Sequence, residues 1–156
     1  YGLYNRRYFV GKLEQEAQLM SEFKHKSSLI AVKLSKEIDS QVNSEKALGL
    51  MTRTIARLLL KTSRRSDIIA HYGKGIFMMM LKHTNIDNAK NASERLWELV
   101  SSSNFFLAEK EINLKISIGV SEISNRISVD ETIVCTIEAM SLCDDSQSSH
   151  FEVCGK

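Results

Sequence analysis

Hydrophobic residues recur at helical spacing in four segments of the chain. In the first segment, Phe9, Leu13 and Ala17 share one face, and Asn5 is a residue type that caps helix N-termini. In the second, Leu48 and Ile55 belong to a similar stripe. The pattern therefore predicts helices over residues 5–24, 44–62, 87–101 and 129–142.

The intervening segments are short and apolar or alternate between apolar and polar residues, which is typical of strands. Two of them flank Gly73-Lys74-Gly75, and two glycines around one residue supply the positive φ angles of a tight hairpin. The segment 112–120 alternates strictly, so we expect one strand there. The predicted strands are residues 29–34, 67–72, 76–82, 112–120 and, as a short edge strand, 150–153.

The order of these elements predicts the fold class. Helices and strands do not alternate strictly, and a hairpin lies in mid-chain, which argues against a purely parallel sheet. We expect an α+β fold with a central mixed, largely antiparallel sheet of about five strands flanked by helices. A length of 156 residues fits one domain over residues 1–156.

Composition excludes several classes of protein. The chain is 43% hydrophobic and 26% charged, so it can bury a core and is not intrinsically disordered. No apolar run approaches the roughly 18 residues that a membrane span needs. Twenty-one basic residues against 19 acidic ones give a net charge of +2, too balanced to grip nucleic acid by bulk charge. We expect no nucleic-acid partner and no direct membrane contact.

Three cysteines lie late in the chain, at positions 135, 143 and 154. Their number is odd and no Cys-x-x-Cys pair suggests zinc, so we expect free thiols in a reducing, cytoplasmic compartment. The chain opens at Tyr1 without an initiator Met or a signal peptide. We interpret it as a domain cut from a longer multidomain protein, whose other domains would be its partners.

Several motifs, in the right order, together resemble the GGDEF domain family, whose active members are diguanylate cyclases. Residues 2–9, Gly-Leu-Tyr-Asn-Arg-Arg-Tyr-Phe, resemble the family's entry motif, Thr-Gly-Leu-x-Asn-Arg-Arg-x-Phe, without its first residue. Arg64-Arg65-Ser66-Asp67 and then Tyr72-Gly73 are similar to its Arg-x-x-Asp and Arg-Tyr-Gly-Gly-Asp-Glu-Phe. Residues 117–120 match its Ser-Ile-Gly-Val. The resemblance fades after about Ser141, and it implies a sheet wrapped by helices with the signature on the central hairpin.

The signature itself has lost its acidic residues. It aligns with residues 73–77, Gly-Lys-Gly-Ile-Phe, so Gly75 and Ile76 stand where cyclases carry metal-binding carboxylates. The family's Asp-x-Asp at the end of the first strand reads Lys33-Leu34-Ser35, to within one residue, and its guanine-binding Gly-Asp aligns with Leu48-Gly49. Condensing two GTP molecules needs Mg²⁺ on carboxylates, and a lysine ammonium would repel the metal. The resemblance therefore implies a domain without cyclase activity and without bound Mg²⁺.

The Arg-x-x-Asp motif, in contrast, is present. In the family it forms the inhibitory site that binds cyclic di-GMP, and Arg64 and Asp67 match it. An arginine can donate to guanine O6 and N7 or to phosphate, and a carboxylate can accept from guanine nitrogen. Arg95 stands where the family's auxiliary arginine of this site falls. We expect a cyclic di-GMP receptor with Arg64, Asp67 and Arg95 as ligand-binding residues, which an intercalated ligand dimer could bridge into a homodimer.

Three other interpretations remain open on the sequence. The domain could be a ligand-independent dimerisation or protein-interaction module, with Arg64 and Asp67 only a surface ion pair. It could be a diguanylate cyclase with a displaced metal site, since Glu37 and Asp39 lie just beyond the first strand. It could also hold GTP as a regulator in the altered site, although the loss of the guanine-binding carboxylate argues against this.

Overall fold

The computed structural model describes residues 3–107 and 109–155, and it has five helices and seven strands in that range. Gly2, the first residue of the entry motif, lies outside the described residues. The helices are α1 (Arg6–Phe23), α2 (Lys36–Asp39), α3 (Glu45–Thr62), α4 (Ile86–Ser101) and α5 (Val129–Ser146). The strands are β1 (Ser28–Leu34), β2 (Ile68–Gly73), β3 (Ile76–Leu81), β4 (Asn104–Leu107), β5 (Lys110–Asn113), β6 (Ile116–Glu122) and β7 (Glu152–Val153).

Local sequence signals place the helix starts. Each long helix begins after a residue whose side chain accepts a hydrogen bond from a backbone N–H of the first turn. Asn5 caps α1 as predicted, and Ser128 with Glu131 forms a capping box on α5. Because these caps satisfy backbone N–H groups that would otherwise have no partner, residues close in sequence determine where each long helix begins.

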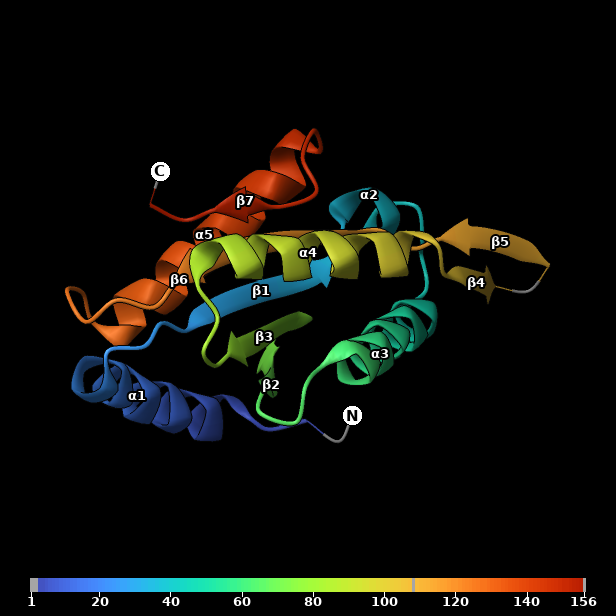
Figure 1. Ribbon diagram of the computed structural model, residues 1–156. Coiled ribbons are helices and arrows are strands. Elements are labelled where there is room, and N and C mark those ends of the chain that lie inside the picture. The colour runs from blue at the N-terminus through green and yellow to red at the C-terminus, as the bar shows by residue number, and fades with distance from the viewer. Residues whose placement is uncertain (1–2, 108, 156) are drawn as a thin grey trace.

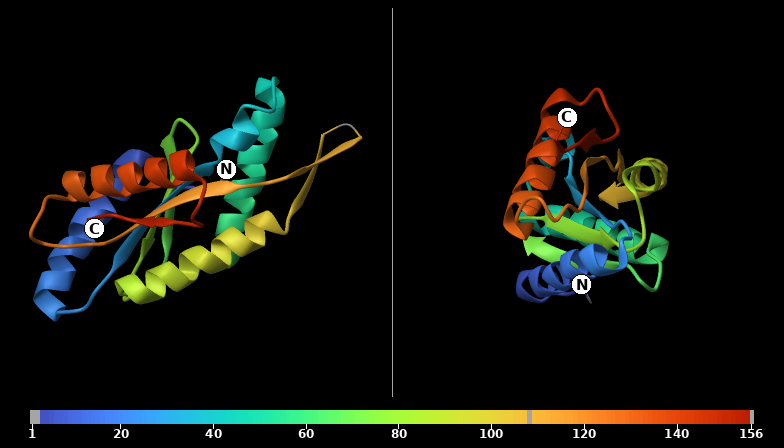
Figure 2. Two further views of the ribbon diagram at one scale, coloured as in Figure 1. Left: turned by 90° about the horizontal axis from the view of Figure 1, so that it is seen from above. Right: turned by 60° about the vertical axis from the view of Figure 1, so that its left-hand side comes forward.

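A five-stranded sheet of order β2-β3-β1-β6-β7 forms the centre of the fold (Figures 1 and 2). All its pairings are antiparallel except the short β6–β7 pair, so the predicted α+β class with a mixed, largely antiparallel sheet is confirmed. The predicted edge strand near the C-terminus is β7.

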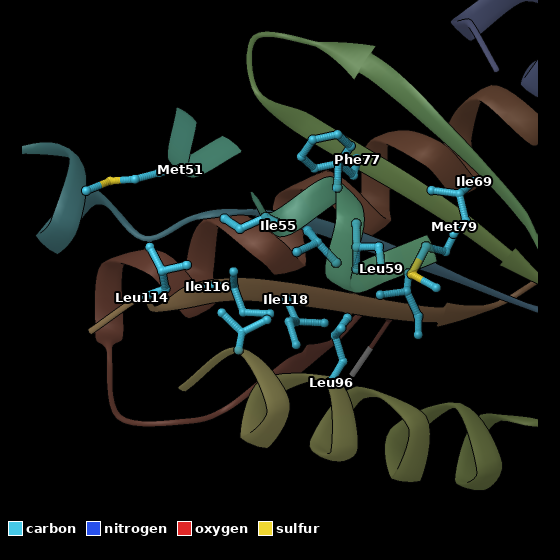
Figure 3. Close-up of a cluster of buried hydrophobic side chains, with 14 of the residues drawn as sticks. Met51, Ile55, Leu59, Ile69, Phe77, Met79, Leu96, Leu114, Ile116 and Ile118 are labelled. Carbon is cyan, nitrogen blue, oxygen red and sulfur yellow. The ribbon is translucent and has the colours of Figure 1, made fainter. Parts of the chain in front are cut away.

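Alternation along the strands divides the core into two layers. On β1, Ile30 and Val32 pack with α3 and α4, whereas Leu29 and Ala31 pack with α1 and α5. Figure 3 shows the larger cluster, in which side chains of α3 and α4 meet those of β2, β3 and β6. The same alternation places the side chain of Lys33, two residues after Ala31, on the face covered by α1 and α5.

The β2–β3 hairpin has the predicted turn. Gly73 and Gly75 have φ angles of 100° and 76°, and Lys74 between them has a φ of 54°. The N-terminal motif packs against this hairpin, because the guanidinium of Arg6 donates to the carbonyl of Tyr72 at 3.0 Å and lies 4.2 Å from the centroid of its ring. The entry motif and the signature therefore form one structural unit.

One predicted strand was wrong. Residues 112–120 are not one strand, because residues 114 and 115 separate β5 from β6. β5 instead pairs with β4 in a separate two-stranded hairpin that extends away from the main sheet (Figure 2). Apolar alternation continues across the break from Ile112 to Leu114 and Ile116, since all three are buried, and a pattern of period two cannot reveal such an interruption.

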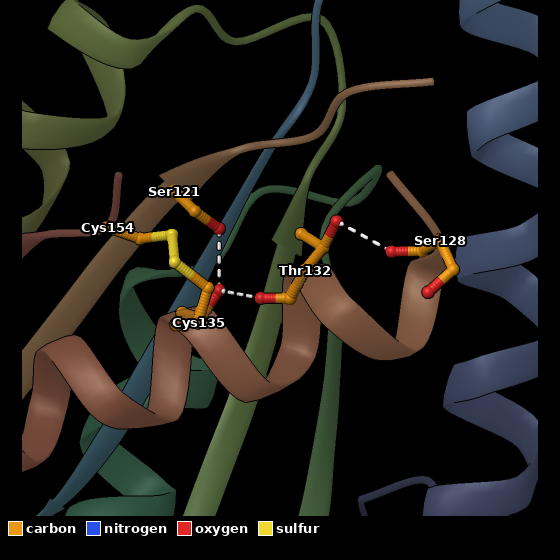
Figure 4. The surroundings of a disulfide bond; sticks show 6 residues. Ser121, Ser128, Thr132, Cys135 and Cys154 are labelled. Carbon is orange, nitrogen blue, oxygen red and sulfur yellow. Dashed lines mark hydrogen bonds between the residues drawn. A yellow bond between two sulfur atoms is a disulfide. The ribbon is translucent and has the colours of Figure 1, made fainter. Parts of the chain in front are cut away.

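The expectation of three free thiols was also wrong. Cys135 of α5 is joined to Cys154 in a disulfide, next to β6 (Figure 4), and only Cys143 is a free, buried thiol among the described residues. The backbone N–H of Cys154 also donates to the carbonyl of Val120 at 2.7 Å. The C-terminal segment is thus held against the sheet edge by a covalent bond and a strand pairing.

Gly119 explains part of the Ser-Ile-Gly-Val motif. A Cβ at this position would lie 2.5 Å from the backbone nitrogen of Met140 and would also collide with the carbonyl of Thr136. α5 therefore crosses β6 so closely that only glycine fits.

Candidate ligand pocket and the altered strand end

A cavity of about 580 Å³ opens between α3 and α4 above the sheet. Its floor is apolar and includes Ile30, Met79 and Leu96. Its rim is polar and carries all three residues that the sequence analysis selected, together with His83, Thr84, Asn88 and Asn91. A volume of a few hundred Å³ with an apolar floor and a few convergent polar groups is typical of small-molecule sites.

Arg64 and Asp67 lie in the loop between α3 and β2 and contact each other directly. Arg64 Nη2 and Nε donate to Asp67 Oδ1 at 2.9 and 3.2 Å, and the backbone N–H of Arg64 donates to Asp67 Oδ2 at 2.8 Å. The carboxylate side chain is only 4% exposed, whereas that of Arg64 is 54% exposed. The pair is therefore anchored on its acidic side and open to solvent on its basic side.

The guanidinium of Arg64 is also held by the segment that follows β3. Its Nη2 donates to the carbonyl of Lys82 at 3.1 Å and to the hydroxyl of Thr84 at 2.9 Å. Thr84 is buried and follows β3, so its contact with Arg64 was not visible in the sequence. These bonds position the guanidinium at the cavity mouth, with an orientation fixed by two loops.

Arg95 lies on the exposed face of α4, one turn after Asn91, and both residues line the same cavity. The structure thus brings the three sequence-predicted residues to one pocket from two elements, the α3–β2 loop and α4. Two arginines and two amides around an apolar floor can bind a planar, hydrogen-bonding, anionic ligand.

A second site of interest lies at the C-terminal end of β1. Val32 pairs with Phe77, so the residues that follow and precede them, Lys33 and Ile76, lie at the same end of neighbouring strands. The ammonium of Lys33 is 3.1 Å from Asp144 Oδ2, near the end of α5. An internal ion pair therefore lies beside the hairpin that carries the altered signature.

Asp144 is almost fully buried, with 4% of its side chain exposed, and it has several partners. Burial alone would raise the pKa of Asp144. The backbone N–H of Lys36 at 2.9 Å, the Ser117 hydroxyl at 2.8 Å and the Lys33 ammonium outweigh burial and hold the pKa below its ordinary value. Asp144 is thus an ionised carboxylate whose hydrogen-bonding and charge partners all come from this chain.

Comparison with known proteins identifies the fold. The model of the family described as "Diguanylate cyclase, GGDEF domain" matches residues 2–142. This chain belongs to the GGDEF domain family. A curated relative, diguanylate cyclase A of Treponema denticola, is 25% identical to this GGDEF domain over 134 residues. That match covers 83% of this chain but only 36% of the relative's length.

Solved structures share the fold of this GGDEF domain at low sequence identity. The GGDEF domain of YfiN from Pseudomonas aeruginosa superposes with a TM-score of 0.87 at 17% identity, over 99% of this chain and 98% of that one. The GGDEF domain of FimX from the same organism gives 0.82 at 19%, over 97% and 94%. The GGDEF domain of DgcB from Caulobacter crescentus, solved in complex with c-di-GMP, gives 0.84 at 16%, over 97% and 88%. At these identities the likeness establishes the fold alone.

The residues of this GGDEF domain do not fit the Mg²⁺ that its family implies. Lys33, Gly75 and Ile76 stand where the family has carboxylates, and none of them supplies an oxygen ligand from its side chain. The hydroxyl of Ser35 accepts a hydrogen bond from the backbone N–H of Glu37 and caps α2. Asp144 is present, but the Lys33 ammonium already contacts one of its oxygens. Within residues 3–107 and 109–155 no group of three or more His, Cys, Asp or Glu side chains could hold a metal ion. Glu37, a possible substitute ligand, lies 3.2 Å from the ammonium of Lys115.

Sequence reasoning missed Asp144, Thr84 and His83. None belongs to a motif that the chain displays, and each approaches its partner from a distant part of the sequence.

In the described part of the chain no helix is long and apolar enough to cross a membrane.

Proposed function

We propose that this GGDEF domain is catalytically inactive and acts as a receptor for cyclic di-GMP, bound by Arg64, Asp67 and Arg95. The observation that carries the proposal is the pocket itself. Two arginines and a carboxylate line one cavity of about 580 Å³, and the carboxylate is fixed by three hydrogen bonds. Cyclic di-GMP presents two guanines and two phosphates, which are the groups that such side chains recognise.

We propose a separate role for each of the three ligand-binding side chains. The guanidinium of Arg64 donates to guanine O6 and N7 or to a phosphate, and Asp67 accepts from the guanine nitrogen atoms. Arg95 approaches from α4 and donates to the second base or stacks on it. The apolar floor excludes water from these bonds and so strengthens them. The structure of DgcB in complex with c-di-GMP is consistent with this ligand class for a related fold.

The proposed lack of cyclase activity rests on the strand end. A 3′-hydroxyl must be activated and charge on the attacked phosphate must be neutralised, which Mg²⁺ on carboxylates normally does. Here Gly75 and Ile76 offer neither a ligand nor a base, and Lys33 adds a positive charge 3.1 Å from the nearest carboxylate. We expect no Mg²⁺ to bind at this strand end.

Calorimetric titration with cyclic di-GMP tests the receptor. We expect saturable heat for the unaltered domain and its loss in Arg64→Ala and in Asp67→Ala. Arg57→Ala is the matched control, because it removes an exposed arginine of α3 that does not line the cavity. No heat at about 100 μM ligand, roughly the threshold for −5.5 kcal/mol of binding, would favour a ligand-independent interaction module instead.

A separate assay tests inactivity. The domain is incubated with GTP and either Mg²⁺ or Mn²⁺, and the products are separated by chromatography. We expect only GTP to be recovered. Any cyclic dinucleotide above a no-protein control would show a displaced metal site and would overturn this part of the proposal.

The proposed output is a homodimer bridged by an intercalated pair of ligands, which light scattering with and without cyclic di-GMP would detect.

A further inference from the structure

His83 lies on the wall of the ligand pocket, in the turn between β3 and α4. Its side chain is exposed and its backbone is left-handed, with φ at 54°. Its two neighbours in sequence, Lys82 and Thr84, both accept hydrogen bonds from Arg64. The turn that carries His83 is therefore the same turn that positions the proposed ligand-binding arginine.

The ring of His83 contacts the ring of a second histidine, His25. The ring of His25 lies 4.2 Å from it, centroid to centroid, with the planes tilted by 32°. His25 Nε2 lies 2.7 Å from Oε2 of Glu16, a carboxylate that is only 3% exposed. Ser27 completes the support, since its hydroxyl donates to the same Glu16 oxygen at 2.6 Å and its Oγ accepts from the backbone N–H of His83 at 3.1 Å.

Charged and titratable groups come to the neighbourhood of His83 from several elements, as its ring partner, as lining of the same pocket or as its neighbour in sequence. The charged or titratable groups are Glu16 of α1, His25 of the α1–β1 loop, Arg64 and Asp67 of the α3–β2 loop, Lys82 of its own turn and Arg95 of α4. The charge of Arg64 is already balanced by Asp67 at 2.9 Å. A bound anion with two phosphates therefore leaves negative charge in the pocket that a further cation can stabilise.

Imidazole is the side chain whose charge changes between about pH 5 and 8, and phosphodiesters keep their charge throughout that range. A phosphate in the cavity would therefore attract a protonated imidazole on the pocket wall at any pH in this range.

We propose that His83 is a proton-dependent contact for the anionic ligand of this pocket. The protonated ring adds a positive charge beside Arg64 and Arg95, so the ligand binds more tightly as pH falls from about 8 to 5.5. The inference rests on the proposed binding of cyclic di-GMP at this pocket, and it adds a regulation of affinity by pH.

The test is calorimetry with cyclic di-GMP at pH 8.0, 7.0, 6.0 and 5.5 and constant ionic strength. For the unaltered domain we expect the affinity to rise about five- to tenfold over this range, which is the lower end of typical coupling between two sites. Titrations near pH 6.5 in buffers of different ionisation enthalpy should show net proton uptake on binding. If His83 had only a structural role, ligand binding would take up no protons.

His83→Asn is the decisive variant, because asparagine tolerates the left-handed backbone that this position requires. It should abolish both the pH dependence of the affinity and the proton uptake on binding. His83→Gly is a second variant with the same expectation and the lowest backbone strain. His150→Asn is the matched control, because His150 stacks on Trp97 of α4 but does not line the cavity.

The outcomes separate the two proposals. Binding whose affinity does not change with pH, or whose pH dependence survives in His83→Asn, overturns the role of His83 and leaves the receptor proposal standing. Absence of binding at all four pH values overturns both.

Discussion

Replacing Lys33 by methionine tests whether the ion pair with Asp144 stabilises the strand end. Methionine keeps most of the aliphatic length of lysine but removes the ammonium, so the change acts mainly on the charge. Asp144 would then remain 4% exposed with its hydrogen bonds from Ser117 and Lys36 but without a cation at 3.1 Å.

The magnitude follows from the burial of the two partners. Breaking a fully buried pair costs about 3–5 kcal/mol, because it leaves an uncompensated charge, whereas exposed pairs contribute about 0.2–1 kcal/mol. The Lys33 side chain is 32% exposed and two hydrogen bonds to Asp144 survive, so the cost lies between these limits. We expect Lys33→Met to lower the free energy of unfolding by about 2 kcal/mol.

Urea unfolding at pH 7, followed by circular dichroism, measures this free energy. Asp144→Asn and the double variant complete a double-mutant cycle. The double variant should recover about half of the unfolding free energy that Lys33→Met loses, because it leaves no unpaired buried charge. Lys36→Met is the control, since Lys36 and Asp145 form an exposed pair with side chains 52% and 70% exposed, and we expect no resolvable change there.

Two results would contradict a stabilising ion pair between Lys33 and Asp144. One is an unfolding free energy of Lys33→Met equal to that of the unaltered domain. The other is strict additivity in the cycle, which would mean that Lys33 and Asp144 are neighbours without energetic coupling.

The buried Asp144, the close helix crossing at Gly119 and the disulfide should each have a measurable effect on stability. Acid should destabilise the domain below about pH 4. The pKa of Asp144 in the folded domain lies under its ordinary value of 3.8, so the stabilising contribution of this carboxylate is present above pH 3.8 and is lost as pH falls through the folded pKa. Asp144→Asn should therefore flatten the acid side of a plot of unfolding free energy against pH. Gly119→Ala should lower the melting temperature by several degrees, because its Cβ would lie 2.5 Å from the nitrogen of Met140; an unchanged melting curve would contradict the close crossing. Reduction of the disulfide by a phosphine should lower the free energy of unfolding by up to about 3 kcal/mol, because the Cys135–Cys154 bond closes a loop over a separation of 19 residues. If a Cys135→Ser variant lost as much stability on phosphine treatment as the unaltered domain, that result would argue against this bond.

The strongly periodic parts of the fold were predictable from the sequence alone. Asn5 caps α1 as its side-chain chemistry suggests, and Gly73 and Gly75 take the positive φ angles that a tight hairpin requires. These features depend on interactions within a few residues. The same local logic identified the four long helices, because each carries a continuous apolar face.

Features that depend on distant contacts could not be predicted in this way. The disulfide joins Cys135 to Cys154 because β7 pairs with β6, and that pairing is a tertiary result. Asp144 reaches Lys33 across 111 positions of the chain, and neither residue type signals the other. The short hairpin of β4 and β5 was missed because buried Leu114 continues the strand pattern across its end.

The candidate pocket falls between these two cases. The residue types and the spacing of Arg64 and Asp67 identified them in the sequence, and the structure places them with Arg95 at one cavity. His83 and Thr84 contribute to the same cavity because β3 ends there, which only the assembled sheet determines.

A crystal structure of the domain grown with cyclic di-GMP and Mg²⁺ would test the proposed receptor site and the proposed lack of a metal site together. We expect the dinucleotide in the cavity between α3 and α4, with a guanine against Arg64 and Asp67, and no metal at the hairpin of Gly73 and Gly75. Nucleotide bound elsewhere with the cavity empty, or a metal ion coordinated at that hairpin, would contradict this expectation.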